Sequence, residues 1–481
     1  MSTHPTLVSV SPRFGHLVMI ALTIGLTLAT FACGGSSSTS TTTTTPPPVS
    51  VPTTTQSTAT QIKIGDAPAD RVITFEATVG PITMTPSSGG AVTVLSGTRR
   101  LELTHLSGTN EPLALLNVPQ GSYSSASITV SKPEVTFINN AGALIKLEPA
   151  LNQVVTVNFG PALTIGANSM VVNIDLNVAN SLTFDAQGNV TGVNLSAASF
   201  GLSTATVAAE DKQGHDDGEL EDTTGVITAV NGSSFNLTVG QNGASLTFST
   251  DANTEFNDGA TLTINTIVTV EGLTKSDGTL YAKEVEGIED ASGMEAEGLI
   301  TQVTGNPATK ITLLADDGLG SGMDDTKVGG SITADVSEAK YKVNKGNIDN
   351  SGIGGLPSSP TFPFDATSVH AGQRVEVESG LALLGSSTVG DKVKLQQQAL
   401  VGTVSGLAGS TTTGPIIFTL SMPADSVFAM LSGMTQITVY WQPGTDLHKL
   451  ASVSNGDTVR VRGLVFFTGT GFNMIARRID Q

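Results

Sequence analysis

The stretch that decides the fold of the C-terminal half is residues 225–232, GVITAVNG. It returns as residues 298–305, GLITQVTG, and more loosely as residues 402–409, GTVSGLAG, each time with a glycine at both ends. A second element follows each copy: residues 268–273 (VTVEGL), 375–381 (VEVESGL) and 459–464 (VRVRGL). Self-similarity on this scale indicates tandem modules. The sequence therefore predicts three related modules, and the middle one carries an insertion because its two elements lie furthest apart.

Within the first element, the apolar residues at its third and sixth positions have opposite parity. Successive side chains of a strand alternate between its faces, so one face can receive both residues only through a bulge or strong coiling. Small closed barrels need such strands. The modules resemble the family called domain of unknown function 5666, and the resemblance implies five-stranded barrels like the OB fold. Residues 282–285 and 476–479 align as last strands, whereas the middle module has no clear counterpart.

Upstream, residues 61–208 contain short alternating runs of Val, Ile and Thr separated by Gly, Pro, Asn and Asp. This pattern indicates antiparallel strands and favours a β-sandwich. Residues 64–70 (IGDAPAD) and 116–123 (LNVPQGSY) resemble the bacterial lipoprotein family called domain of unknown function 4382, whose members have no assigned reaction. Gly121 is expected to supply a positive φ in a turn, and Tyr123 is expected to anchor the core rather than to stack on a ligand.

The N-terminal region carries a targeting signal. Arg13 precedes an uncharged apolar run from Leu17 to Ala32, which is shorter than the roughly 20 apolar residues that span a bilayer, so a signal-peptide core is favoured over a membrane-spanning helix. Residues 29–33 (ATFAC) resemble the lipobox of bacterial lipoprotein precursors, with Thr30 where the commonest lipobox has Leu. The resemblance implies that Cys33 is acylated and becomes the mature N-terminus. A buried free thiol is the alternative, but the Gly and Ser/Thr residues that follow can bury nothing.

Acylation of Cys33 implies stable attachment to a membrane through its lipid chains. Gly34 rather than Asp after the cysteine favours the outer membrane, by analogy with bacterial sorting rules. Residues 33–60 are rich in Ser, Thr and Pro and predict a disordered tether that holds the folded part away from the lipid. We therefore expect a cell-envelope protein whose partners are the membrane, through the lipid, and a glycan or an envelope protein.

The predicted fold class is all-β, an N-terminal β-sandwich followed by three tandem small OB-like β-barrels. The predicted boundaries are 1–32 for the signal peptide, 33–60 for the lipidated cysteine and tether, 61–208 for the sandwich, 209–223 for an acidic linker, 224–290 for the first barrel, 296–399 for the second barrel with its insertion, and 400–481 for the third.

Composition excludes several functions. The 481 residues include 23 Lys and Arg against 42 Asp and Glu, a net charge of -19, so nucleic acid is not an expected partner. Aromatic residues make up 5%, and the core is therefore expected to be aliphatic. Cys33 is the one cysteine, which excludes an intramolecular disulfide and a thiolate metal cage.

The sequence contains no catalytic motif: no Gly-x-Ser-x-Gly elbow, no phosphate-binding Gly-Lys-Ser/Thr loop and no His-Glu-x-x-His helix. No catalytic, cofactor-binding or metal-ligating residue is therefore predicted. The acidic clusters are expected to be solvated loop charge, with weak Ca²⁺ binding as the alternative. These clusters are residues 316–318 with Asp324 and Asp325, and Asp211 with residues 216–217.

For other isolated polar residues, the sequence favours structural roles over functional ones. The four histidines of the expected mature chain, His105, His215, His370 and His448, are expected in turns or on the surface. Asp66 and Asp70 are expected to make turn and strand-start hydrogen bonds, with a cation site as the alternative.

We expect a non-catalytic binding or structural protein. The alternative is an extracytoplasmic glycan-acting hydrolase that uses a carboxylate pair. Tyr440 and Trp441 offer one plausible stacking pair for a sugar, but core and rim positions in the third barrel are favoured for them. The apolar residues of the insertion, around positions 356–364, either dock a partner or pack on their own barrel.

Overall fold

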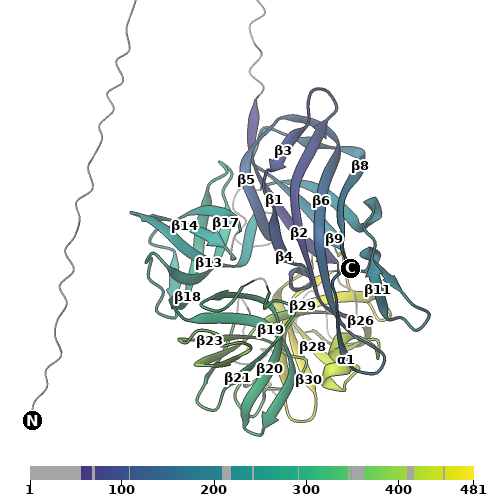
Figure 1. The fold of residues 1–481 in the computed structure, drawn as a ribbon, viewed down its shortest axis with the longest axis vertical. Coiled ribbons are helices and arrows are strands. Elements are labelled where there is room, and N and C mark those ends of the chain that lie inside the picture. Colours follow the sequence, from purple (N-terminus) through teal and green to yellow (C-terminus); the bar gives the residue numbers. More distant parts are fainter. Residues whose placement is uncertain are drawn as a thin grey trace, which may run out of the picture. The chain divides into compact units, whose positions relative to one another are not determined.

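The computed structural model describes residues 56–67, 71–107, 109–207, 218–240, 243–290, 292–324, 326–344, 348, 362–408, 416–447 and 450–480. The predicted signal peptide, Cys33 and most of the predicted tether lie outside these residues. Within them, no helix has the length and apolar character that crossing a membrane requires. The described chain consists mainly of β-strands, which confirms the predicted all-β class (Figure 1).

The first folded region is a sandwich of two sheets. One sheet holds β1 (Ser57–Ala67), β5 (Glu111–Pro119), β9 (Met170–Asn177) and β12 (Phe200–Thr206). The other holds β2 (Val72–Pro86), β3 (Val92–Leu95), β4 (Arg99–Glu102), β6 (Gly121–Ile138), β7 (Leu144–Leu147) and β8 (Asn152–Ile165). A hairpin of β10 (Leu182–Phe184) and β11 (Val190–Val193) and three short 3-10 helices complete it: η1 (Thr104–Leu106), η2 (Ala179–Ser181) and η3 (Ala197–Ser199).

Alternating apolar residues of the two sheets form one core, as the period-two pattern predicts. Ile62 and Ile64 of β1 and Phe75 of β2 are fully buried in it. Tyr123 is 1% exposed, and its hydroxyl donates to the carbonyl oxygen of Pro119 at 2.7 Å, which confirms its predicted place in the core. The φ angle of Gly121 is 152°, as the turn before β6 requires.

The sandwich begins earlier than the sequence suggests. Strand β1 starts at Ser57, inside the predicted tether, and pairs with β5 from Ser57 opposite Pro119 to Thr60 opposite Leu116. This segment is rich in Ser and Thr, like the residues before it, so its composition places it in the predicted tether. Its backbone nevertheless completes a sheet, because pairing along β5 satisfies the N–H and C=O groups whatever the side chains are.

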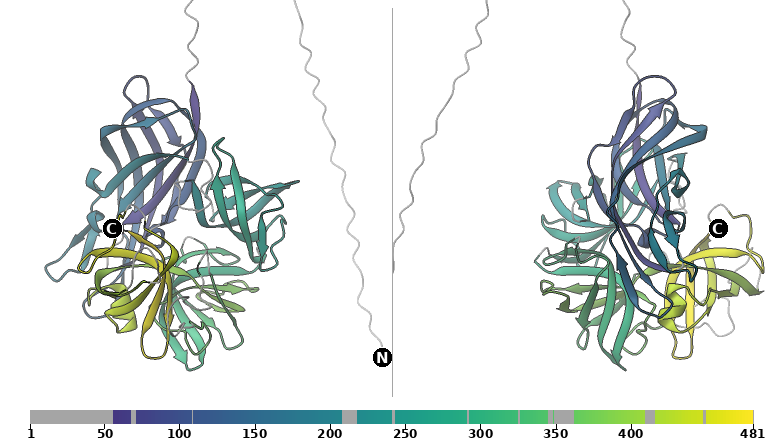
Figure 2. Two further views of the ribbon diagram at one scale, coloured as in Figure 1. Left: turned by 180° about the vertical axis from the view of Figure 1, so that it is seen from behind. Right: turned by 45° about the vertical axis from the view of Figure 1, so that its right-hand side comes forward.

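Three barrels follow, drawn in teal, green and yellow in Figures 1 and 2. The first comprises β13 (Glu219–Asn231), β14 (Ser234–Val239), β15 (Ser245–Ser249), β16 (Glu255–Asn257), β17 (Thr266–Thr274) and β18 (Leu280–Asp290). The second comprises β19 (Met294–Gly305), β20 (Ala308–Gly320), β21 (Ser331–Asp335), β22 (Lys340–Val343), β23 (Arg374–Ser379), β24 (Ser387–Val389) and β25 (Lys392–Leu395). The third comprises β26 (Gln397–Ala408), β27 (Ile416–Ser421), the helix α1 (Val427–Ser432), β28 (Gln436–Asp446), β29 (Thr458–Phe467) and β30 (Phe472–Asp480).

The three barrels share one strand order. In the third, β26-β27-β28-β30-β29 closes on itself, with β28 and β30 parallel. In the first, β13, β14, β15, β18 and β17 occupy the same places, and β15 pairs parallel with β18. In the second, the last strand is split, so that β24 pairs with β21 and β25 pairs with β23. This split explains why the sequence of the middle module shows no counterpart of the final strand.

The register shift predicted for the first element is present in every copy. Between β13 and β14, Ile227 and Ala229 face consecutive residues, so Thr228 is an extra residue. Between β19 and β20, Thr301 is extra in the same way, and between β26 and β27 the register shifts between Ser405 and Ala408. Each bulge allows the third residue of the repeat to lie in the core while the sixth packs against the same core.

The leading glycine of the repeat has a steric cause. A Cβ added at Gly225 would lie 2.4 Å from the carbonyl oxygen of Thr238 on the facing strand. At Gly298 the corresponding distance, to the carbonyl oxygen of Leu314, is 2.0 Å, and at Gly402, to that of Ser421, it is 2.7 Å. In all three barrels the first two strands therefore cross too closely for any side chain.

The insertion of the second barrel packs on its own barrel where the structure describes it. Phe362 and Phe364 are buried in the core of that barrel. The ring of Phe362 also lies 5.3 Å from Tyr440 and 5.4 Å from Phe466 of the third barrel. Trp441 belongs to the core of the third barrel, so the predicted core position of this residue is confirmed.

Replacing Gly225 by Ala is expected to destabilise the first barrel by about 3 kcal/mol, because a methyl group against a backbone carbonyl cannot be relieved by a rotamer change. Gly232→Ala is the matched control: its φ is 62°, which costs an L-residue about 1 kcal/mol, and a Cβ there meets no atom within 4 Å. Hydrogen exchange of β13 and β14 measures both effects. Equal effects of the two substitutions would contradict the steric explanation.

Candidate functional site

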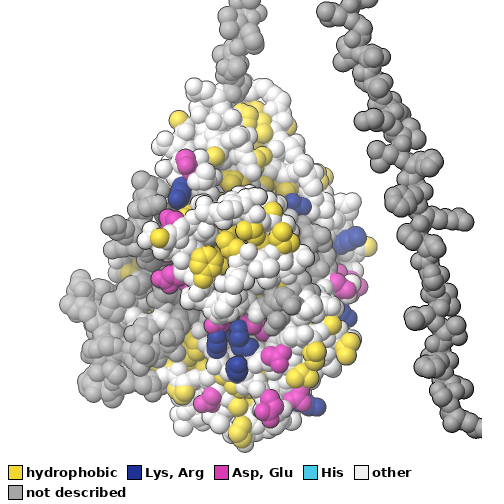
Figure 3. Space-filling view, turned by 90° about the vertical axis from the view of Figure 1, so that its left-hand side faces the viewer, with side chains coloured by type: hydrophobic (Ala, Val, Ile, Leu, Met, Phe, Trp, Pro, Cys, Tyr) yellow, Lys and Arg dark blue, Asp and Glu magenta, His cyan; other side chains and the backbone are white. Residues whose placement is uncertain are grey.

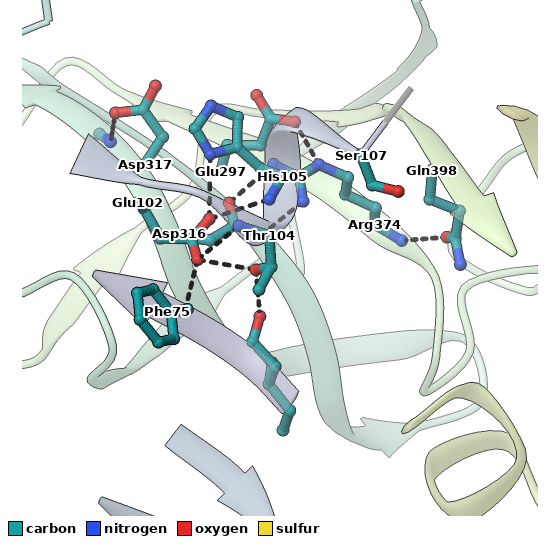
Figure 4. A network of polar contacts seen from close by, with 12 residues as sticks. Phe75, Glu102, Thr104, His105, Ser107, Glu297, Asp316, Asp317, Arg374 and Gln398 are labelled. Atoms are coloured by element: carbon teal, nitrogen blue, oxygen red, sulfur yellow. Dashed lines mark hydrogen bonds and ion pairs between the residues drawn. The ribbon is translucent and has the colours of Figure 1, made fainter. Parts of the chain in front are cut away.

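The site begins where strand β4 of the sandwich ends. Glu102 is the last residue of β4, and η1 follows with Thr104 and His105. The Glu102 carboxylate Oε1 accepts hydrogen bonds from the backbone N–H of Phe75 at 2.7 Å and from the backbone N–H and hydroxyl of Thr104 at 3.0 and 2.7 Å (Figure 4). Its Oε2 accepts from the backbone N–H of His105 at 2.9 Å and lies 3.0 Å from His105 Nδ1. The turn of η1 therefore wraps donors around one buried carboxylate.

Glu102 and His105 fix each other's charge. Burial alone raises the pKa of a carboxyl group and lowers that of an imidazole. For Glu102, which is 6% exposed, the hydrogen bonds and charge of His105 outweigh burial and hold the pKa below its usual value. For His105, the hydrogen bond and charge of Glu102 outweigh burial and raise the pKa to about 9. The pair is a carboxylate and an imidazolium at neutral pH.

Arg374 reaches the same place from the second barrel. It is 7% exposed, and its Nη1 and Nη2 donate to the two carboxylate oxygens of Asp316 at 2.6 and 2.8 Å, while Nε donates to Glu297 at 2.6 Å (Figure 4). The register of β19 against β20 shifts after Glu297, which leaves Asp316 as an extra residue in a bulge. A bulge redirects a side chain, and this one directs Asp316 to the guanidinium.

Side chains of the other two barrels complete the junction. Arg462 of the third barrel donates through Nη1 to the carbonyl oxygen of Ser107 in the sandwich at 3.3 Å. Glu221 of the first barrel accepts from Arg477 of the third at 3.4 Å. Burial raises the pKa of Glu221, but Arg478 and Arg477 outweigh it and hold the pKa below its usual value. All four modules therefore contribute charged or polar groups to one place, which we call the junction.

The junction contains two cavities of about 110 Å³ each. The charged residues in the wall of the first are Glu76, Arg100, Glu102, His105, Glu111, Glu221, Glu297, Asp316, Asp317, Arg374 and Arg462. The second shares His105, Arg374 and Arg462 with the first but has a more apolar wall. A water molecule needs roughly 10–15 Å³ on this measure, so each cavity has room for several waters or a small polar ligand. None of the described residues lining the first cavity is Phe, Tyr or Trp.

Three carboxyl groups in the wall of the first cavity have a pKa that burial raises to about 7, and one of them is Asp316, where the charge of Arg374 opposes the shift. Burial, with the charges of Asp317 and Glu102, raises the pKa of Glu111 to about 7, although His105 opposes the shift. Burial, with the charge of Glu134, raises the pKa of Glu76 to about 7, although Arg100 opposes it. The cavity thus combines ionised carboxylates with groups that can donate a proton near neutrality.

A second group of carboxylates lies on the outer face of the second barrel, beside the first cavity. Glu295 and Glu297 of β19 and Glu376 of β23 each offer an oxygen, and these oxygens lie within 4.8 Å of one another. Two ionised carboxylates at that distance repel by roughly 3 kcal/mol at an effective dielectric constant of about 20. Burial and the surrounding carboxylates raise the pKa of Glu295, and burial raises that of Glu376. We call Glu295, Glu297 and Glu376 the glutamate cluster.

Ion pairs join the first and second barrels next to this cluster. Lys392 Nζ lies 2.7 Å from Glu378 and 3.4 Å from Asp258 of the first barrel, and Lys394 pairs with Glu286 of the first barrel. On the face shown in Figure 3, one group of Lys and Arg side chains has Asp and Glu side chains beside it, and further charged side chains are scattered over the rest of the face.

The structure gives the following outcome for the residues that the sequence singled out. Several of them lie outside the described residues: Cys33, Asp70, Asp211, residues 215–217, Asp325 and His448. Asp66 is buried, and its Oδ1 accepts from the backbone N–H of Val178 at 3.3 Å, as expected for a structural hydrogen bond. His370 packs on Phe467 with ring centroids 4.4 Å apart.

The acidic residues at positions 316–325 do not behave as one group. Asp316 is buried against Arg374, so the expectation of solvated loop charge is wrong for this residue. Asp324 is exposed and accepts from the backbone N–H of Thr326 at 2.9 Å. The bulge separates their environments, because it directs one side chain inward while the other stays in a turn.

Sequence reasoning missed the residues that form the junction. Glu102, Arg374 and Glu221 stand in different modules, and none belongs to a motif. One signal was available: β23 reads Arg-Val-Glu-Val-Glu-Ser, with charged residues at alternate positions, so its polar face was visible. That this face is buried follows only from the packing of the modules.

Comparison with known protein families gives a match in the first barrel. The model of the family described as Domain of unknown function (DUF5666) matches residues 224–286, which is the first barrel and agrees with the resemblance found in the sequence. No curated protein matches the chain. The resemblance of the sandwich to the other lipoprotein family stays a prediction.

Two solved structures show faint likenesses. One is described as Drosophila Unr CSD456; it has 10% sequence identity and a TM-score of 0.12, and the match covers 55% of this chain and 97% of that chain. The other is a multidomain protein with nucleic acid binding domains from Streptococcus pneumoniae, with 10% identity and a TM-score of 0.10, covering 54% of this chain and 72% of that chain. TM-scores this low carry no argument about ligands.

The His105 pair makes stability depend on pH. The pKa of His105 is about 9 in the folded protein and exceeds the ordinary value of 6.5. The stability that the charged pair contributes is therefore complete below pH 6.5 and is lost as the pH rises through 9. We expect His105→Gln to remove roughly 3 kcal/mol of pH-dependent stability over this interval. Urea unfolding between pH 6 and 9.5 measures the slope. The control is His370→Gln, which replaces a ring that is hydrogen-bonded to the carbonyl oxygen of Ala371. An unchanged slope in His105→Gln would contradict the assignment.

Proposed function

We propose that this chain is a lipid-anchored, non-catalytic protein of the bacterial cell envelope, too acidic to bind nucleic acid, whose folded part binds a glycan or an envelope protein as one connected body. The observation that carries the non-catalytic role is the use of charged side chains at the junction. They connect modules to one another, as Arg462 does with Ser107, Glu221 with Arg477 and Lys394 with Glu286.

Connection through buried polar groups favours a binding or structural role. A buried charge that loses its partner costs 3–5 kcal/mol on the usual scale, whereas an exposed pair contributes about 0–1 kcal/mol. The paired groups of the junction are therefore suited to holding the modules in one arrangement. A binding surface made from several modules needs such an arrangement, because it must be formed before the partner arrives.

The envelope location rests on the sequence. The apolar run that ends at Ala32, the small residues before Cys33 and the Ser/Thr/Pro-rich segment after it are typical of a lipoprotein precursor. The large negative charge also favours a partner that carries no polyphosphate. Envelope glycans and proteins satisfy this condition.

A glycan-acting hydrolase is the second candidate, and one observation favours it. Glu111 borders a cavity and has a pKa of about 7, which suits a general acid, and ionised carboxylates lie in the same wall. Sugar sites, however, commonly present aromatic side chains, and the described wall of this cavity contains no Phe, Tyr or Trp. Two of the nearby carboxylates, Glu297 and Asp316, are already bonded to Arg374.

The anchor is tested by replacing Cys33 with Ser in the producing bacterium. We expect the wild-type chain to incorporate radiolabelled palmitate and to have the mass of a chain beginning at an acylated Cys33, and Cys33→Ser to lose both properties. Ser36→Ala is the control, because it leaves the residues around the cleavage site intact. A wild-type chain without label and with its first 32 residues retained would contradict the proposal.

The role is tested by incubating the full chain with envelope glycans and comparing it with Glu111→Gln. We expect no cleavage by either protein, and retention of a glycan or an envelope protein by both, because Glu111 is not needed for a non-catalytic site. Glu148→Gln, an exposed carboxylate of the sandwich, is the control. Cleavage by the wild type that Glu111→Gln alone abolishes would establish the hydrolase instead.

A further inference from the structure

The glutamate cluster has the geometry of a cation site. Glu295 and Glu297 are two residues apart on β19 and therefore project from the same face of the sheet. Glu376 lies opposite Glu297 on the neighbouring strand β23. Oxygens of the three side chains lie within 4.8 Å of one another. The strands of the second barrel thus hold three carboxylates together on a regular backbone.

A separate observation points to a missing ligand. Glu295 and Glu376 are each 3% exposed, yet Oε2 of Glu295 and Oε1 of Glu376 have no hydrogen-bond partner among the described residues. Buried carboxylate oxygens normally accept hydrogen bonds or bind metals. Gln396 donates to Oε2 of Glu376, but the described residues supply no donor for the other oxygen of Glu376 or for Oε2 of Glu295.

The neighbouring cations are engaged elsewhere. Lys392 contacts Glu378 and Asp258, and Lys394 pairs with Glu286. Arg374 donates one hydrogen bond to Glu297, and its two remaining arms hold Asp316. The charge of Lys394 also acts on Glu376. At Glu295, by contrast, the strongest neighbouring charges all come from carboxylates. An added cation would balance them.

We propose that Glu295, Glu297 and Glu376 bind a calcium ion. The donors are all carboxylate oxygens, which hard cations prefer. Ca²⁺ holds its oxygens at roughly 2.3–2.6 Å, so two ligands on opposite sides are about 5 Å apart, which matches the spread of this cluster. Mg²⁺ holds them at roughly 2.0–2.1 Å and demands a tighter octahedron. The site is distinct from the proposed partner-binding role and does not depend on it.

The junction provides a path to the glutamate cluster and the water molecules that would serve as the remaining ligands of the ion. Glu297 lines the first cavity as well as belonging to the cluster. Because that cavity has room for several waters, water can reach the ion and complete its coordination. Glu297 also connects the site to Arg374, so an ion bound there acts on the contact between the second barrel and the junction.

The test uses the full chain in detergent, stripped with a chelator and dialysed against radioactive Ca²⁺. We expect one Ca²⁺ per chain, with half-saturation between about 0.1 and 1 mM, as in extracellular calcium modules. About 10 mM Ca²⁺ is expected to raise the Tm by a few degrees, and the same concentration of Mg²⁺ to raise it less. A wild-type chain that binds no Ca²⁺ overturns the proposal.

Variants locate the ion. Glu295→Gln and Glu376→Gln are each expected to lose the bound Ca²⁺ and its Tm shift, because each removes one carboxylate ligand. Glu378→Gln changes the same face of β23 but leaves the cluster intact, and Asp324→Asn alters the acidic turn; both are expected to keep the Ca²⁺ response. Loss of binding in Asp324→Asn, with binding retained in Glu295→Gln and Glu376→Gln, overturns the proposal.

A readout on the wild type keeps the test decisive if the glutamine variants do not fold. Hydrogen exchange with and without Ca²⁺ is expected to show added protection in β19 and β23, which carry the three ligands. Protection confined to other segments, such as the turn after β20, overturns the proposal.

Discussion

Burial of charge where β-modules meet is the constraint on which this structure depends. Neighbouring modules share some apolar contacts, such as that of Ile73 in the sandwich with Leu314 of the second barrel and Val427 of the third, but the faces that meet at the junction are polar. When those faces come together, their charges leave water, and each then needs a partner. Arg374 finds two carboxylates in its own barrel, Glu221 finds an arginine of the third barrel, and Lys394 finds a glutamate of the first. The junction is the result of these pairings, and it holds the modules together alongside apolar contacts such as that of Phe362 with Phe466.

The same constraint divides the acidic residues into two kinds. Glu102 collects backbone and side-chain donors and stays ionised in a buried place. Glu111 and Glu295 lack such partners, and burial raises their pKa values. Groups of the second kind can still bind a proton, a cation or a ligand. Both of them lie at or next to the cavity, so the functional potential of the chain concentrates at the junction rather than inside any single barrel.

Much of the fold follows from local pattern. Alternation of apolar residues predicts strands, and the repeat with its leading glycine predicts three related barrels and the bulge that each contains. The reason is physical: Gly225 permits a close crossing of strands, and the parity of Ile227 and Val230 allows only a bulged strand. The start of β1 and the split last strand of the second barrel were not predictable in this way, because backbone pairing decides them and side chains there give no signal.

The sequence by itself determined the all-β class, the repeat and the acidic character, since all of these depend on residues close together in the chain, and it predicts a lipoprotein precursor. Only the tertiary structure decided which charges are buried and which carboxylates meet. Glu102 and Arg374 come from separate modules, and Glu295 and Glu376 lie on strands whose pairing spans the whole insertion of the second barrel. Charge burial depends on what covers a face, and a strand pattern records only that the face is polar.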